Sequence, residues 1–496
     1  MKIAFVASEG VPFSKTGGLA DVVGALPQAL ASIGHQVDVI LPRYRTTQPG
    51  PVDSPARSVT VPLSSGFKFA SFQAPRSAAG GVQTYLMDCP ELFDRDGLYT
   101  SGGQDYPDNA LRFAAFSMGS LEFLKRFSEP PDVIHCHDWQ SALAPVYLRT
   151  LYKSDPFWEN TSTLFTIHNI GYQGLFPAGT LSEISLDKGL FTVDGLEYYG
   201  KINLLKGGMI FSDSISTVSQ KYAQEIQTEE FGFGLEGVLR SRSHRLQGIL
   251  NGVDYGAWNP ATDKLIPANY TPENLHGKTV CKKALLERMG ARKPALDRPV
   301  LGIVSRFAAQ KGFDLIAKIA DDLMQMDLYI VALGTGEPEY EQLFRELAGR
   351  YPEKFLVQIA YDNSLAHQIE AGADMFVMPS RYEPCGLNQI YSLKYGTVPV
   401  VRATGGLDDT IEQFDGVKGT GFKFSEYSPR ALLACLRQAM DVFRQKAAWL
   451  KLQQNGMQKD FSWTQSARRY VTLYQSLCDE KTKGKVSSVG ASPQIH

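Results

Sequence analysis

The first 33 residues, MKIAFVASEGVPFSKTGGLADVVGALPQALASI, combine the signals that decide the fold. Residues 3–7 form a short apolar run typical of a buried strand, and residues 22–33 carry the apolar spacing of a helix. Between them lies the loop Lys15-Thr16-Gly17-Gly18-Leu19-Ala20-Asp21. A strand that leads through a glycine loop into a helix gathers backbone amides, a helix N-terminus and a lysine, which suits an anion. The alternative is a tight turn with a surface lysine, and a two-glycine loop alone does not decide between them.

Short apolar runs alternate with longer amphipathic stretches along most of the chain. The runs lie at residues 37–41, 133–135, 164–167 and 215–218, and again at 301–304, 329–333, 355–359, 375–378 and 398–401. This alternation is typical of a parallel sheet covered by helices. A chain of 496 residues is also too long for one ordinary core. We therefore predict an α/β protein built from two Rossmann-like halves.

The domain boundaries follow from changes in composition. We predict an N-terminal domain at residues 1–250, a C-terminal domain at 251–460, a helix at 461–480 that returns to the N-terminal domain, and a disordered tail at 481–496. A polar segment with Gly252 and the step Asn259-Pro260 separates the two domains, and it is the predicted hinge region. The tail is rich in Ser, Gly and Lys and has no periodicity.

Charge and cysteine content exclude several classes of protein. With 50 Lys and Arg against 52 Asp and Glu, the net charge of −2 indicates no general attraction to nucleic acid or to an anionic membrane. The six cysteines show neither a C-x-x-C pair nor the spacing of a disulfide framework. No signal-peptide pattern precedes the first strand, and no apolar run approaches the length of a membrane span. We therefore expect a soluble, cytoplasmic protein.

Charged residues and glycines follow three apolar runs of the second half. Arg306 and Lys311 follow the run at 301–304, and Glu383 follows the run at 375–378. Ligands of open α/β sheets bind at the carboxyl ends of strands, so two cations there would neutralise a diphosphate, and Glu383 could hold sugar hydroxyls. The glycine loop at 404–407 offers amides to a phosphate. Another turn, at 333–336, has no acidic residue placed for a ribose, and we interpret its glycines as serving chain geometry.

Two polar clusters of the first half are candidates for a metal site. His135 and His137 are expected on opposite faces of their strand, and no carboxylate or cysteine set completes a tetrahedral site. We therefore interpret His135 as a hydrogen-bonded core residue. Asp94 and Asp96 resemble a metal-diphosphate signature, but they precede a turn glycine and such a short match arises easily by chance. No metal is expected.

Seven ordered motifs, spread over nearly the whole chain, resemble one family. They are K-T-G-G-L-A-D at 15–21, H-D-W at 137–139, H-N-I at 168–170, L-N-G-V-D at 250–254, S-R-x-x-x-Q-K-G at 305–312, S-R-Y-E-P-C-G-L at 380–387 and T-G-G-L at 404–407. The family is that of the ADP-glucose-dependent bacterial glycogen synthases and plastidial starch synthases, which are retaining glycosyltransferases of the GT-B fold. The resemblance implies two Rossmann-like domains across a deep cleft, and transfer of glucose from ADP-glucose to the non-reducing end of an α-1,4-glucan.

The resemblance also implies roles for individual residues. The expected diphosphate ligands are Lys15, Gly18, Arg306, Lys311, Thr404, Gly405 and Gly406. Tyr361 would stack on adenine. The residues expected around the glucose are Asp21, Asn251, His168 and Glu383, with Asp138 nearby and the amides of Cys385, Gly386 and Leu387 assisting. The expected catalytic set is Glu383, His168, Lys311, Arg306 and Asp138.

The resemblance further implies front-face attack by the acceptor hydroxyl, assisted by the leaving phosphate, so we name no general base. Many GT-B enzymes carry a second glutamate eight residues after the first, where this chain has Tyr391. Glycogen synthases also lack that glutamate, so its absence favours this family over the other GT-B families. Two other functions stay open: a catalytically silent paralogue that binds glucan or nucleotide sugar, and a dinucleotide-dependent oxidoreductase with a poor fingerprint. No cofactor is expected.

Overall fold

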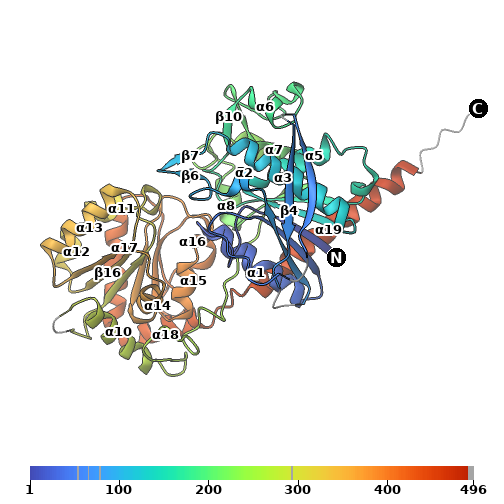
Figure 1. Ribbon diagram of the computed structural model, residues 1–496. Helices are drawn as coiled ribbons and strands as arrows, with labels where there is room; N and C mark the ends of the chain where they lie inside the picture. The colour runs from blue at the N-terminus through green and yellow to red at the C-terminus, as the bar shows by residue number, and fades with distance from the viewer. Residues whose placement is uncertain (53–54, 65, 77–79, 292–293, 490–496) are drawn as a thin grey trace, which may run out of the picture. The chain divides into compact units, whose positions relative to one another are not determined.

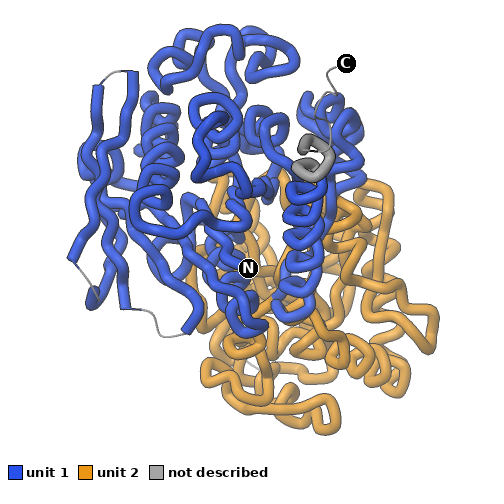
Figure 2. Tube along the Cα trace, turned by 90° about the vertical axis from the view of Figure 1, so that its right-hand side faces the viewer, with its two compact units in different colours: residues 1–218, 223–252, 463–496 blue, residues 219–222, 253–462 orange. Residues whose placement is uncertain are grey.

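The computed structural model describes residues 1–52, 55–64, 66–76, 80–291 and 294–489. The chain divides into two compact units, coloured separately in Figure 2. Unit 1 contains residues 1–218, 223–252 and 463–496, and unit 2 contains residues 219–222 and 253–462. Unit 1 is therefore discontinuous in sequence, because its last segment follows the whole of unit 2.

A nine-stranded sheet forms the centre of unit 1 (Figure 1). In spatial order its strands are β14 (Leu246–Gly248), β13 (Ser214–Thr217), β9 (Ser162–Ile167), β8 (Val133–His137), β1 (Lys2–Val6), β2 (Gln36–Pro42), β5 (Val82–Asp88), β4 (Gly66–Gln73) and β3 (Arg57–Leu63). All neighbours from β14 to β5 pair in parallel, as the buried apolar runs predict.

The β3–β4 edge of this sheet was not expected from the sequence. β4 pairs antiparallel with both β5 and β3, and β3 alternates exposed and buried residues along its length. Such alternation is typical of a sheet with one solvated face, and it lacks the continuous apolar run of a buried parallel strand. Two small sheets are formed by β10 (Leu175–Pro177), β11 (Glu197–Tyr198) and β12 (Lys201–Asn203), and by β6 (Thr100–Ser101) and β7 (Gln104–Asp105).

The helices of unit 1 include one that arrives from the far end of the chain. They are α1 (Gly18–Ser32), α2 (Pro90–Phe93), α3 (Asn109–Phe127), α4 (Asp138–Ser141), α5 (Leu143–Arg149), α6 (Thr180–Glu183), α7 (Leu204–Phe211), α9 (Glu236–Ser241) and α19 (Trp463–Val489). Helix α19 packs against α1, and its Tyr470 and Tyr474 share a buried core with Ile3 and Phe5 of β1. The helix α8 (Gln220–Glu225) begins in the short segment that groups with unit 2.

Unit 2 contains a six-stranded parallel sheet. Its strands, in spatial order, are β17 (Phe355–Ile359), β16 (Tyr329–Gly334), β15 (Val300–Val304), β18 (Met375–Met378), β19 (Val398–Arg402) and β20 (Phe422–Phe424). Its helices are α10 (His276–Arg288), α11 (Phe313–Lys318), α12 (Ala320–Gln325), α13 (Pro338–Arg350), α14 (Asn363–Gly372), α15 (Asn388–Lys394), α16 (Gly405–Thr410), α17 (Pro429–Arg444) and α18 (Lys446–Met457).

Both faces of the unit 2 sheet are buried. Leu301 of β15 and Ile330 of β16 belong to one core, whereas their neighbours Val300 and Val331 belong to a second core. Successive side chains of a strand point to opposite faces, so an uninterrupted apolar run fills both cores at once. Gly334, at the end of β16, supports the interpretation that the glycines at 333–336 serve chain geometry. A Cβ at this position would lie 1.9 Å from the Ser305 carbonyl oxygen, so only glycine fits.

Apart from the short segment at residues 219–222, the chain passes into unit 2 after Gly252 and returns to unit 1 at Trp463. Val253 donates its N–H to the carbonyl of Phe461 at 2.9 Å, and the Ser466 hydroxyl donates to the carbonyl of Leu250 at 2.6 Å. The predicted boundary after residue 250 thus lies two residues before the unit boundary after Gly252.

The predicted disordered tail is wrong over its first part. Helix α19 continues to Val489, because each residue added to an existing helix gains a backbone hydrogen bond at little further cost. The rest of the predicted tail, residues 490–496, lies outside the described residues. In the part of the chain that the structure describes, no helix is long and apolar enough to cross a membrane.

Candidate active site

Each sheet has a point where the strand order reverses. In unit 1, β1 lies between β8 and β2, and in unit 2, β15 lies between β18 and β16. Ligands of open α/β sheets bind outside the carboxyl ends of the strands at such points. The candidate residues of unit 1 follow β1, β8, β9 and β14, and those of unit 2 follow β15, β17, β18 and β19. Each unit therefore carries its own group of candidates at one edge of its sheet.

A buried carboxylate that the sequence analysis missed holds the glycine loop of unit 1. Glu9 is 3% exposed and follows β1. It accepts hydrogen bonds from the backbone N–H of Thr16, from the Thr16 hydroxyl at 2.6 Å, from the Gly17 N–H at 3.3 Å and from the Tyr99 hydroxyl at 2.6 Å. The amides of Thr16 and Gly17 are thus donated to Glu9 in this structure, so the loop does not present them bare as the sequence suggested.

We expect Glu9→Ala to loosen this loop, because it removes an acceptor that serves two backbone N–H groups. Hydrogen bonds to a charged group contribute about 1.5–3 kcal/mol each, and 1.4 kcal/mol corresponds to roughly a tenfold change in an equilibrium. Amide exchange at Thr16 and Gly17 should therefore accelerate by about tenfold or more, with Glu9→Gln intermediate because it keeps one acceptor oxygen. Unchanged exchange at both amides in Glu9→Ala would contradict the assignment.

The two charged residues predicted at this loop contact each other. The Lys15 Nζ lies 2.7 Å from Oδ1 of Asp21, and the two side chains are 44% and 31% exposed. An ion pair this exposed contributes little to stability, so it can be exchanged for other partners at low cost. The loop therefore keeps the predicted cation at its surface, beside the start of α1.

Asp138 positions the segment that carries His168. Its partly buried carboxylate accepts the His168 N–H at 2.7 Å and is also hydrogen bonded by the backbone of Asn169. Burial raises the pKa of Asp138 to about 7, against the effect of these two backbone hydrogen bonds. Asp138 has φ of +55°, a left-handed conformation that aspartate tolerates better than most residues. The structure thus joins two predicted residues from neighbouring strands, β8 and β9.

The two histidines of β8 correct one expectation. His135 and His137 lie on the same face of the strand, with ring centroids 4.1 Å apart, because residues two apart in a strand share a face. The prediction of opposite faces was wrong. The interpretation of His135 as a hydrogen-bonded core residue is confirmed: it is fully buried and contacts the Thr166 hydroxyl at 2.6 Å and the Tyr474 hydroxyl at 2.8 Å. Among the described residues, no group of three or more His, Cys, Asp or Glu could hold a metal ion.

Asn251 completes the candidates of unit 1. It lies after β14, is 6% exposed, and its Oδ1 atom is buried without a hydrogen-bond partner among the described residues. Buried polar atoms in proteins are nearly always paired, so an unpartnered one at a strand's carboxyl end marks a position for a ligand or water.

In unit 2, the two strands at the reversal point supply an ion pair. Lys311, after β15, places its Nζ atom 3.0 and 2.7 Å from the two carboxylate oxygens of Glu383, after β18. The Ser380 hydroxyl donates to the same carboxylate at 2.9 Å. The Glu383 side chain is 7% exposed and that of Lys311 is 18% exposed. The structure therefore brings together two predicted residues that are 72 positions apart in the sequence.

The loop after β18 packs tightly on the loop that opens α16. The Gly406 N–H donates to the Glu383 carbonyl at 3.1 Å, and a Cβ at Gly406 would lie 2.0 Å from the carbonyl oxygen of Cys385. The N–H groups of Thr404 and Leu407 also donate within the protein. Glycine is therefore required for the contact between the loops, and the predicted phosphate-binding role of the 404–407 loop stays a prediction.

Two predicted residues of unit 2 stand apart from this packed centre. Arg306 is exposed after β15, and its guanidinium makes no ion pair or hydrogen bond to the residues that the structure describes. Tyr361, after β17, is 85% exposed. An unpaired guanidinium and an exposed aromatic ring are each suited to a ligand, but the structure brings neither into contact with Glu383.

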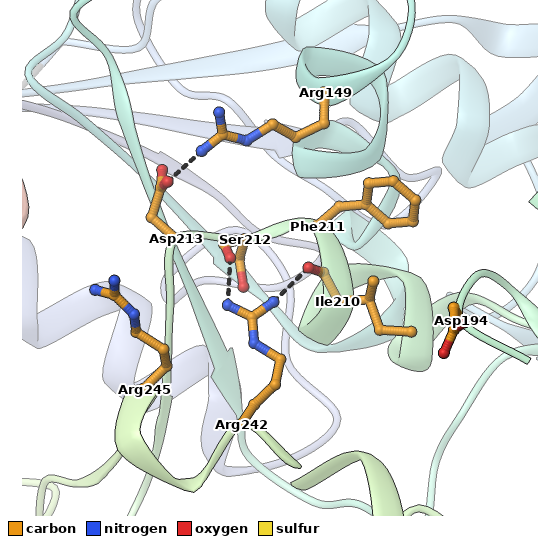
Figure 3. A pocket seen from close by; sticks show the side chains of 8 residues that line it. All are labelled: Arg149, Asp194, Ile210, Phe211, Ser212, Asp213, Arg242 and Arg245. Carbon is orange, nitrogen blue, oxygen red and sulfur yellow. Dashed lines mark hydrogen bonds and ion pairs between the residues drawn. The ribbon is translucent and has the colours of Figure 1, made fainter. Parts of the chain in front are cut away.

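A separate pocket of about 450 Å³ lies in unit 1 (Figure 3). Arg242 donates to the carbonyls of Met209 and Ser212 at 2.6 and 2.7 Å, and Arg149 pairs with Asp213. Asp213 directly precedes β13, so the pocket lies at the amino end of that strand. The candidate residues follow carboxyl ends, and the pocket is therefore distinct from the candidate site.

Two domain families match the chain. The starch synthase catalytic domain matches residues 2–241, and the group 1 glycosyl transferases match residues 288–449. The glycogen synthase of Koribacter versatilis is 55% identical over 477 residues, which cover 96% of this chain and 98% of the relative. That of Geotalea uraniireducens is 47% identical over 479 residues, with 96% and 98% covered.

Comparison with solved structures also finds a starch synthase and a related fold. The catalytic domain of starch synthase IV from Arabidopsis thaliana, bound to ADP and acarbose, matches with a TM-score of 0.88 and 32% identity, covering 96% of this chain and 99% of that chain. A sucrose-phosphate synthase from Thermosynechococcus elongatus, at a TM-score of 0.59 and 17% identity, shares the fold.

Each of the two α/β units has a largely parallel sheet with polar groups at the carboxyl ends of its strands. Together with the family match and the solved starch synthase, this architecture defines a glycosyltransferase of the GT-B fold class. The chain belongs to the family of bacterial glycogen synthases and starch synthases. The family and fold class that the seven motifs predicted are thus confirmed.

Proposed function

We propose that the protein transfers glucose from ADP-glucose to the non-reducing end of an α-1,4-glucan with retention of configuration, and releases ADP. The observation that carries this proposal is the 55% identity to a glycogen synthase over 96% of the chain. The ADP and acarbose of the starch synthase IV structure support a nucleotide and a glucan as the ligands. The proposed place of action is the cytoplasm.

The proposed ligands of the donor diphosphate are cationic side chains. Lys15, Arg306 and Lys311 neutralise the charge that develops on the departing ADP, and preorganised charges of this kind stabilise a transition state strongly. The guanidinium of Arg306 has no partner among the described residues, which supports this role. Glu383, His168, Asp21 and Asn251 hold the glucose. Tyr361 stacks on adenine, and its 85% exposure leaves the ring available for that contact.

The test is an ADP-release assay with glycogen as acceptor, run with ADP-glucose and UDP-glucose side by side. We expect release of ADP together with incorporation of glucose into the glucan, and slower turnover of UDP-glucose. A silent paralogue would bind glycogen but release no ADP, which would overturn the proposal. Enhanced fluorescence of reduced nicotinamide on addition of the protein would instead support an oxidoreductase.

We expect the enzyme to stay active after metal chelation, because the proposed site neutralises the charge of ADP with cationic side chains. Activity after incubation with EDTA and removal of the chelator should stay within about twofold of the untreated enzyme. Asp94 and Asp96, the residues that resemble a metal signature, are both paired with Arg45 at 2.8 and 2.7 Å. Complete inhibition by EDTA that is reversed by a divalent metal would contradict the expectation and point to these two carboxylates.

A further inference from the structure

The buried ring of His137 contacts the proposed sugar-binding histidine directly. Nδ1 of His137 lies 3.0 Å from Nε2 of His168. His137 is fully buried, and its other nitrogen, Nε2, has no hydrogen-bond partner among the described residues. The ring stacks on Phe5 at a centroid distance of 5.1 Å. The buried ring of His137 therefore has one hydrogen-bond contact among the described residues, and that contact is with His168.

Both rings are neutral in this setting. Burial lowers the pKa of His168 to about 3, and burial together with the neighbouring rings of His135 and His168 lowers the pKa of His137 well below its usual range. Each neutral imidazole carries one N–H and one lone pair. The short contact thus contains a single proton, which belongs either to Nδ1 of His137 or to Nε2 of His168.

The surroundings of His137 favour the first arrangement. If its proton sat on Nε2, a buried N–H would have no acceptor, and orphaned buried N–H groups are rarer than unfilled acceptor positions. With the proton on Nδ1, the N–H donates to His168. His168 must then carry its own proton on Nδ1, an atom that makes no hydrogen bond to the described residues, in a residue that is 9% exposed.

We propose that His137 is a positioning residue that holds His168 in the Nδ1–H tautomer, so that His168 presents a hydrogen-bond donor to its ligand. In the opposite tautomer the same nitrogen would present a lone pair. The ligand atom that the imidazole recognises is thus an acceptor oxygen, which a sugar hydroxyl or a phosphate supplies. The identity of that ligand rests on the proposed function, whereas the tautomer itself does not.

The tautomer is measured without any substrate. The full chain is labelled with ¹⁵N in its histidine rings, and long-range ¹H–¹⁵N correlation spectra are recorded at pH 8, where both rings are neutral. His168→Gln and His137→Asn assign the two rings among the eight histidines of the chain. We expect the protonated nitrogen of His168 to be Nδ1. A protonated Nε2, or a mixture of the two forms, overturns the proposal even if the enzyme is fully active.

Kinetics test whether the tautomer matters for turnover. His137→Leu removes the donor, so His168 should become a mixture of tautomers and kcat with ADP-glucose should fall by about tenfold. His137→Asn keeps an N–H donor near the same place and should restore kcat to within about threefold. His135→Asn is the matched control, because His135 is equally buried but makes no hydrogen bond to His168.

The outcomes separate this proposal from the proposed function. Equal loss of kcat in His137→Leu and His137→Asn, with an unchanged His168 tautomer in both, overturns the positioning role. Absence of any transfer from ADP-glucose in the unmodified protein overturns the proposed function but leaves the tautomer result standing. Should His137→Leu fail to fold, the spectrum of the unmodified chain and the His137→Asn variant still decide the question.

Discussion

Glu383→Ala is expected to lower kcat for glucose transfer by about 10²-fold or more, which is the size of effect seen when one aligned polar contact to a transition state is lost. The carboxylate is buried and fixed by Lys311 and Ser380, so its oxygens are held in place before any ligand arrives. Its backbone carbonyl, which accepts the Gly406 N–H, is kept in the alanine variant. The loss should therefore fall on the reacting geometry and not on the packing of the two loops.

The measurement is kcat and KM for ADP-glucose, with circular dichroism to check the fold. Glu383→Gln keeps the shape and one acceptor oxygen, and it should lie between the alanine variant and the unmodified enzyme. Glu346→Ala, at an exposed position on α13, is the control for loss of a glutamate in the same unit. If kcat/KM of Glu383→Ala stays within threefold of the unmodified enzyme, Glu383 does not belong to the active site. The reason is that a loss of only about 1.4 kcal/mol of transition-state stabilisation already lowers the rate tenfold.

Asp138→Ala is the second change with a large expected effect, a fall of kcat by about 10²-fold. The variant leaves the His168 N–H and the Asn169 backbone without the Asp138 carboxylate as their acceptor. It also places alanine at φ of +55°, where aspartate is better tolerated. A displacement of His168 by about 1 Å is enough for a loss of this size.

Asp138→Asn separates the two causes, because asparagine tolerates the left-handed backbone and keeps one acceptor oxygen. It should retain most of the fold's stability and recover about tenfold of the lost kcat. Thermal unfolding of the three proteins provides the comparison. If Asp138→Asn and Asp138→Ala are equally stable and equally active, neither the backbone conformation nor the amide contacts of Asp138 matter.

The positions of the strands and of most candidate residues could be predicted because they depend on local patterns. Apolar runs locate β1, β8, β15 and β18, and a residue that directly follows a parallel strand must lie at the sheet's carboxyl edge. The sequence therefore predicts Lys311 and Glu383 at one edge of their sheet. The β3–β4 hairpin escaped prediction because its alternating exposure carries no uninterrupted apolar run.

The residues that support the site could not be predicted in the same way. The contact of Glu9 with Tyr99 joins residues 90 positions apart, and only the folded chain brings them together. Its single sequence signal is an acidic residue directly after a buried strand and before a glycine loop. The sequence analysis expects His137 on the face opposite His135, which hides its contact with His168. The two-residue period of a strand places His135 and His137 on one face, as the structure shows.

The return of α19 to unit 1 imposes an order of assembly on the growing chain. Synthesis proceeds at about 5–20 residues per second, so the stretch between Gly252 and Trp463 takes roughly 10–40 s to emerge from a ribosome. During that interval Ile3 and Phe5 lack the cover of Tyr470 and Tyr474, and the His135 ring lacks the Tyr474 hydroxyl. Unit 2, which is continuous apart from four residues, is complete at residue 462, whereas unit 1 is complete only when α19 has been made. A nascent chain that stops before residue 463 therefore exposes an apolar face that chaperones can recognise. Helix α19, the last helix to be synthesised, covers this face of the sheet that β1 begins.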